Sequence, residues 1–156
     1  MEKFLENLYE AEKTLKTASH IIYVTFPLVK DKHLLLKTLT ELKKTISKCI
    51  NAILQYEYLY KRIVLHQSPK ANLKTFKEQC ARRYNITLEE LKQISELFDL
   101  VEKHKESPFE FVKKDKIVIL SENLQPQTLT LEKIKVFLHV SKNILEKTKQ
   151  GLKEDI

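Results

Sequence analysis

The chain has 156 residues, of which 42% are hydrophobic, and its 28 lysines and arginines outweigh 21 aspartates and glutamates to give a formal net charge of +7. This length is typical of one domain, and the hydrophobic fraction is sufficient for a core that needs no disulfides. The only glycine, Gly151, excludes glycine-rich phosphate-binding loops, and such scarcity disfavours a β-rich fold, whose tight turns require positive φ.

The remaining bulk features predict the compartment and the partners. Cys49 and Cys80 stand alone in apolar helical patterns, so we expect buried, reduced thiols. The five histidines include no pair at i, i+4 spacing, so we expect no metal site and no cofactor. No apolar run reaches the length of a membrane span, which predicts a cytoplasmic protein without a membrane partner. The positive charge favours RNA or another polyanion as partner.

The N-terminal part of the chain shows two long amphipathic patterns. Apolar residues at helical spacing predict a first helix over about residues 2–24. Pro27 is expected to end it, because the residue before a proline avoids the α region. Asp31 is expected to cap a second helix over about residues 32–65. That helix would be about 50 Å long, the length of a strut that runs along a bundle.

Shorter helical patterns follow a break at residues 67–69. A third helix is predicted over about residues 71–84. Thr87 and Glu90 then form a capping box, in which each side chain accepts a hydrogen bond from the backbone amide of the other residue. This box predicts the start of a fourth helix, over about residues 88–105.

The periodicity changes from helical to strand-like after the fourth helix. Residues 109–112 and 117–120 are two β-prone runs around the charged residues 113–116, which predicts a hairpin. Because no glycine is present for a tight primed turn, we expect a loop longer than two residues. An isolated hairpin is marginal in water, so it must pack on the helices or pair with another chain.

The C-terminal part returns to a helical pattern. Residues 124–128, which include Pro126, are interpreted as a linker. Thr130 is expected to cap a last helix over about residues 131–149, and Gly151 to close that helix as a C-terminal cap.

Together these elements predict a mainly α fold, an up-and-down helical bundle of about five helices with a short β-hairpin insert near residues 109–120. Residues 1–156 are expected to form this single helical-bundle domain. A homodimer, formed through a helical face or the edge of the hairpin, is one expectation that the pattern leaves open.

The end of the second helix and the third helix carry the strongest candidates for a binding site. Aromatic side chains interleaved with cations stack bases and hold phosphates, although tyrosines at a bundle surface also serve as plain packing residues. Adjacent arginines before a helix break are well placed to bind a phosphate. The predicted nucleic-acid contacts are Tyr60, Lys61, Arg62, Lys77, Arg82 and Arg83.

An arginine followed shortly by a histidine near a helix end resembles the HEPN superfamily of small helical nucleic-acid-processing domains. The residues that carry the resemblance are Arg62 and His66, separated by three residues where the family motif has four to six. The resemblance implies a metal-independent ribonuclease site, usually built across a dimer, with Arg62 and His66 as the catalytic candidates.

The corner before the hairpin holds a third catalytic candidate, His104. With Ser107 and Glu110 it would form a polar cluster in which a histidine and a carboxylate exchange protons near neutral pH. The alternative is a capped corner, with Ser107 as N-cap before Pro108, that only redirects the chain. The stretch also resembles archaeal helical proteins, which implies no activity.

Three functions therefore follow as hypotheses. The leading one is a non-catalytic basic helical bundle that associates with RNA or acts as an adaptor. The alternatives are a HEPN-like metal-independent ribonuclease and a protein-interaction or dimerisation module.

Overall fold

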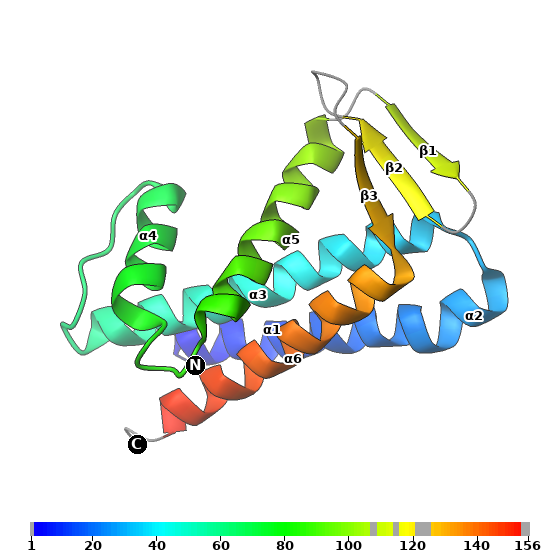
Figure 1. Cartoon of the computed structure of the whole chain (residues 1–156). Coiled ribbons are helices and arrows are strands. Elements are labelled where there is room, and N and C mark those ends of the chain that lie inside the picture. Colours follow the sequence, from blue (N-terminus) through cyan, green and yellow to red (C-terminus); the bar gives the residue numbers. More distant parts are fainter. Residues whose placement is uncertain (1, 107–108, 114–115, 121–125, 154–156) are drawn as a thin grey trace.

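The computed structural model describes residues 2–106, 109–113, 116–120 and 126–153 (Figure 1). Three long helices lie along one another, and a fourth crosses them and ends beside a small sheet at one end of the molecule (Figure 1). The long helices are α1 (Lys3–His20), α3 (His33–Leu59), α6 (Leu131–Lys153) and the crossing α5 (Leu88–Glu106). The shorter ones are α2 (Phe26–Val29), α4 (Pro69–Thr75) and the π-helical turns η1 (Ile21–Thr25) and η2 (Phe76–Cys80). The mainly α fold with its short hairpin is thereby confirmed.

The core lies where α1, α3, α5 and α6 meet. Along α3 its residues recur at helical spacing, and Leu35, Leu39 and Leu42 are completely buried. Both cysteines are buried free thiols, as predicted. Burial raises the pKa of Cys49 to about 12 and that of Cys80 to about 11, so neither thiol ionises near neutral pH.

Pro27 does not end the first helical segment, contrary to the prediction. The chain stays helical to Val29 because the turn before the proline widens into η1, in which the Phe26 amide donates to the Ile21 carbonyl. Pro27 then falls in the first turn of α2, where its missing N–H and its fixed φ are tolerated. A π-turn therefore absorbs the proline that an α-helix could not accommodate.

The second long helix ends at Leu59, six residues before the predicted limit. Lys61 adopts a left-handed conformation with φ of 59°. Its amide donates to the Tyr58 carbonyl, and the Arg62 amide donates to the Glu57 carbonyl. This pair of bonds is a Schellman motif, which satisfies carbonyls at the helix end and reverses the chain. The apolar pattern continues past Leu59, which is why periodicity alone placed the end too late. At the start of the helix, the Asp31 carboxylate accepts from the His33 amide at 3.0 Å, as expected of a capping side chain, but α3 begins at His33 with Lys32 at the N-cap position, one residue later than predicted.

The predicted hairpin consists of β1 (Phe109–Lys113) and β2 (Lys116–Leu120), which pair antiparallel. Lys113 pairs with Lys116, so two residues connect the strands rather than the longer loop expected. Those two residues lie outside the described part of the chain. The order of the sheet is β1-β2-β3, and the hairpin packs within this chain.

The predicted linker after the hairpin is wrong over residues 126–128, because Pro126–Thr130 forms a third strand, β3, antiparallel to β2. The first two residues of that linker, 124 and 125, lie outside the described part of the chain. Pro126 is the first residue of β3, a position at which a strand tolerates its missing N–H. Within β3 only Leu129 is both apolar and buried, so the sequence alternation was too weak to predict a strand. Pairing with the buried β2 determines the conformation instead.

The capping box at the start of α5 is confirmed and is linked to α6. The Thr87 amide donates to Glu90 Oε1 at 2.9 Å, and the Glu90 amide donates to Thr87 Oγ1 at 3.1 Å. The Lys147 ammonium of α6 donates to the same carboxylate oxygen. Burial favours the neutral form of Glu90, but Lys147 and the Thr87 amide outweigh it and lower the pKa of Glu90 below its ordinary value.

The lowered pKa of Glu90 predicts that the stability of the fold depends on pH. Because its pKa is lowered by folding, ionised Glu90 stabilises the fold above its ordinary pKa of 4.5, and this contribution disappears as the pH falls through the lowered value. We expect Glu90→Gln to reduce the free energy of unfolding near neutral pH and to reduce it less in acid. Urea unfolding of both proteins across a pH series measures this, and a constant difference at all pH values would contradict it.

The last helix begins as predicted, since Thr130 Oγ1 accepts from the Lys133 amide at 3.1 Å. Gly151, however, lies inside α6 and not at its end, and it has no positive φ. A Cβ at this position would collide with Cδ1 of Tyr84, whose ring packs directly on the helix backbone. The glycine therefore serves close packing and not the predicted cap.

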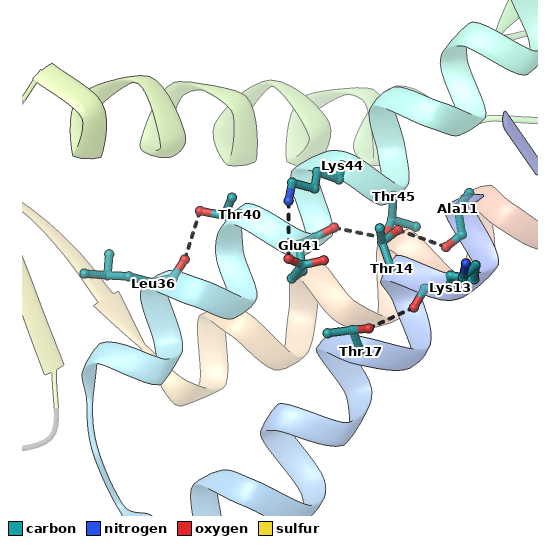
Figure 2. Close-up of polar contacts among 9 residues, drawn as sticks. All are labelled: Ala11, Lys13, Thr14, Thr17, Leu36, Thr40, Glu41, Lys44 and Thr45. Carbon is teal, nitrogen blue, oxygen red and sulfur yellow. Dashed lines mark hydrogen bonds and ion pairs between the residues drawn. The ribbon is translucent and has the colours of Figure 1, made fainter. Parts of the chain in front are cut away.

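A polar contact joins α1 and α3 inside the bundle. Thr14 and Thr45 face each other with their hydroxyl oxygens 2.7 Å apart (Figure 2). Thr14 is also 3.1 Å from the Ala11 carbonyl, and Thr45 is 3.0 Å from the Glu41 carbonyl. Each hydroxyl has one proton, so the two threonines can make only two of these three bonds at once.

This sharing predicts coupling between the two threonines. Each single Thr→Val variant loses the bond between the hydroxyls and is expected to lower the free energy of unfolding by about 0.5–1.5 kcal/mol. The double variant should lose less free energy of unfolding than the two single variants lose together, because both single variants remove the same bond between the hydroxyls. A double-mutant cycle from urea unfolding measures the coupling, and additive values would show that the threonines act independently.

Candidate basic aromatic site

The end of α3 holds a buried carboxylate between two arginines. The Glu57 side chain is 2% exposed. Arg62 Nη1 donates to Glu57 Oε2 at 2.8 Å. Arg83 Nε lies 3.1 Å from Glu57 Oε1, an ion pair whose alignment falls short of a hydrogen bond. Arg62 comes from the turn after α3 and Arg83 from the turn after η2, so Glu57 brings two predicted site residues from separate segments together.

Backbone and side chain act together at this point. The Arg62 amide donates to the Glu57 carbonyl at 2.9 Å, and the Arg62 guanidinium binds the carboxylate of the same residue. Between them Lys61 is held at positive φ, a conformation that costs a non-glycine residue about 1–2 kcal/mol. The backbone and side-chain hydrogen bonds between Arg62 and Glu57 therefore fix the conformation of the turn that contains Lys61.

Aromatic rings extend from the core to this turn. The Phe4 and Tyr56 ring centroids are 5.2 Å apart, and those of Tyr56 and Tyr60 are 4.8 Å apart. The Arg62 guanidinium carbon lies 5.2 Å from the centroid of the Tyr60 ring, a cation–π contact. Tyr56 is buried, whereas Tyr60 is 49% exposed. This row of rings therefore ends at the surface, where the Tyr60 ring and the Arg62 guanidinium contact each other.

Two further cations lie at the surface of the same turns. Lys61 follows Tyr60 directly, and Arg82 directly precedes the anchored Arg83. Both side chains are exposed, and neither forms an ion pair within the described ranges. Together, Tyr60, Lys61, Arg62, Arg82 and Arg83 are called the basic aromatic site below.

Tyr84 packs beneath this site. Its hydroxyl is buried and has no hydrogen-bond partner in the part of the chain that the structure describes. Burial and the negative charge of Glu57 raise the pKa of Tyr84, so the phenol stays neutral in the folded protein. The ring also covers Gly151 of α6, which ties the arginine turn to the last helix.

The other predicted site residues lie elsewhere or make different contacts. The Lys77 ammonium donates to Ser95 Oγ of α5 at 2.9 Å and is half-buried there. His66 exchanges two backbone hydrogen bonds with the Asn72 side chain, and its imidazole forms no hydrogen bond or ion pair within the described residues. His104 is on the last turn of α5, which ends beside the sheet and far from the end of α3 (Figure 1). Ser107 and Pro108, on which the proposed proton-exchanging corner depends, lie outside the described residues.

The sequence pattern does not predict Glu57 and Tyr84 as residues of the site. Glu57 falls four residues after Ile53 on the buried stripe of α3, and it precedes Arg62 by five residues. A carboxylate on an apolar stripe near an arginine was the available signal, because a buried charge requires a partner. The contribution of Arg83 had no local signal, since it reaches Glu57 only through the tertiary fold.

No protein-family model matches the chain, and no curated protein sequence matches it. Among the described residues, no three histidine, cysteine, aspartate or glutamate side chains cluster as metal ligands would. None of the helices in the described ranges is long and apolar enough to cross a membrane.

Proposed function

We propose that the chain binds single-stranded RNA without cleaving it, through the basic aromatic site at the end of α3. The observation that supports this most is the Arg62 guanidinium over the half-exposed Tyr60 ring, with Lys61 and Arg82 exposed on the adjoining turns. A base stacks on the Tyr60 ring or the guanidinium plane, while the two exposed cations bind flanking phosphates.

Preorganisation favours this arrangement over a loose lysine-rich surface. Glu57 fixes Arg62 and Arg83 from below, so the stacking platform loses little conformational entropy when a strand binds. Single-stranded RNA fits better than a duplex, because stacking on a side chain requires an unpaired base. Stacking also tolerates any base, so we expect little sequence preference.

The proposed binding is non-catalytic because Arg62 has a structural task. Its guanidinium holds Glu57 and covers Tyr60, and the His66 imidazole forms no hydrogen bond or ion pair within the described residues. RNA incubated with the protein should therefore remain intact on a denaturing gel. Cleavage that persists with a chelator and disappears in His66→Ala would instead establish the HEPN-like ribonuclease.

Fluorescence anisotropy with a labelled, mixed-sequence single-stranded RNA at low salt tests the binding site. Tyr60→Ala should weaken binding roughly 5- to 150-fold, whereas Tyr60→Phe, which keeps the ring, should bind almost normally. Lys61→Ala should also weaken binding, and Lys92→Ala, which removes an exposed lysine of α5, is the matched charge control. Equal affinities for wild type, Tyr60→Ala and Lys61→Ala would refute the site.

A further inference from the structure

A groove of about 580 Å³ lies between α3, α4 and α5, apart from the basic aromatic site. Both α4 and α5 lie on one side of α3 (Figure 1). The tip of the turn before α4 is fixed by Asn72, whose side-chain amide donates to the His66 carbonyl at 2.7 Å and whose oxygen accepts from the His66 amide at 2.8 Å. The groove is therefore a built feature of the fold, of a size typical for small-ligand sites.

The wall that α3 contributes carries two parallel stripes. Lys43, Ser47 and Asn51 recur every four residues and form a polar stripe of about 12 Å. Ile50 and Leu54 form an apolar stripe beside it. The groove therefore offers hydrogen-bonding groups along one line and an apolar surface along the next.

The polar groups of this stripe are available to a ligand. Within the described residues, the Ser47 hydroxyl and the Asn51 amide form no side-chain hydrogen bond. Lys43 Nζ is 3.8 Å from Glu102 Oε1 of α5, a long ion pair at the surface. Lys70 of α4, which also lines the groove, is exposed and has no ion pair in the same ranges.

The walls that α4 and α5 contribute include apolar side chains as well as the Lys70 ammonium and the Glu102 carboxylate. Phe98 of α5 and Leu73 of α4 are both half-buried. An occupant must therefore present apolar faces to Phe98 and Leu73 and a polar edge to Ser47 and Asn51. An acyl chain would cover these two polar groups without bonding them, which costs free energy for each group left unsatisfied. A nucleobase has both features, two apolar faces and an edge of donors and acceptors.

We infer that the groove binds one nucleoside monophosphate unit, with the base between Phe98 and Leu73, its edge on Asn51 and Ser47, and its phosphate at Lys43 or Lys70. The asparagine amide supplies both a donor and an acceptor, so it pairs with a base edge in two bonds. The lysines at the rim supply point charges for the phosphate. The unit is either a free nucleotide or one residue of a strand. The inference does not depend on the basic aromatic site.

Protein-observed NMR with the full-length chain tests the inference, using AMP, CMP, GMP and UMP as separate probes and inorganic phosphate and decanoate as comparators. At least one nucleotide should cause saturable shifts of the groove amides, among them Ser47, Asn51 and Leu73. Asn51→Ala should weaken that affinity roughly 2- to 10-fold. Lys37→Ala, an exposed α3 lysine outside the groove, should leave it unchanged.

The outcomes separate the alternatives. No saturable groove shift with any mononucleotide or with an oligoribonucleotide, or shifts with decanoate alone, would overturn the inference. Groove shifts with an oligoribonucleotide at concentrations where mononucleotides give none would identify the occupant as a residue of a strand, and the reverse would identify a free nucleotide. Tyr60→Ala should leave mononucleotide binding intact, so failure of the RNA proposal and failure of this one are distinguishable. Thermal unfolding of Asn51→Ala checks that the variant folds.

Discussion

Replacing Arg62 and Arg83 together with alanine is expected to lower the free energy of unfolding by about 3–5 kcal/mol, the cost of leaving a buried carboxylate without a partner. Glu57 is 2% exposed, and these arginines are its cationic partners in the described residues. Each single variant should cost less, because one guanidinium remains. The arginines are themselves 33% and 41% exposed, so solvent reaching the vacated space would place the effect at the lower end of the range.

Urea unfolding with matched variants isolates the cause of this loss. Arg82→Ala removes the neighbouring, exposed arginine and should change stability by less than about 0.5 kcal/mol. Adding Glu57→Gln to the double variant should recover part of the lost stability, because it removes the unpaired charge itself. If Glu57→Gln does not help the double variant, the arginines stabilise the turn through packing and not through the carboxylate.

Gly151→Ala is expected to destabilise the protein by about 1–3 kcal/mol, although alanine is the better helix former. The added Cβ would collide with Cδ1 and Cε1 of Tyr84, so the ring must move. That ring is 2% exposed and packs beside Glu57 and Cys80, which leaves it little room. The free energy of unfolding from urea titrations measures the effect.

The effect of Gly151→Ala on stability should change from destabilising to stabilising when the Tyr84 ring is removed. Tyr84→Ala alone is expected to cost about 3–5 kcal/mol, as for other buried aromatic residues. In that background Gly151→Ala should stabilise α6 by up to about 1 kcal/mol, because only helix propensity then differs. A Gly151→Ala variant that is destabilising in both backgrounds would mean that contacts other than Tyr84 require the glycine.

An element of the fold was predictable from the sequence when the contacts that determine its conformation lie between residues close together in the chain. The Thr87–Glu90 capping box and the Asp31 cap involve side chains within three residues of the helix start, so the sequence was sufficient. The hairpin was predictable for the same reason, since adjacent β-prone runs pair with each other. Its third strand was not, because β3 has little alternation of its own and takes its conformation from β2.

The errors at Pro27 and Gly151 share a physical cause. Each residue has a strong local preference that a wider structural context overrides: a π-turn accommodates the proline, and Tyr84 requires the glycine inside α6. The candidate site shows the same limit. Aromatic and basic residues near the end of α3 were visible in the sequence, but the buried Glu57 that brings Arg62 and Arg83 together was not.

Salt dependence of RNA affinity tests the central proposal most directly. Binding of single-stranded RNA by wild type should weaken linearly on a logarithmic plot against salt, with a slope of about −0.7 for each phosphate contacted. Lys61→Ala should make that slope shallower by about 0.7, while Lys92→Ala should leave it unchanged. Absence of affinity at low salt, or the same slope for Lys61→Ala and wild type, would contradict RNA binding at the basic aromatic site.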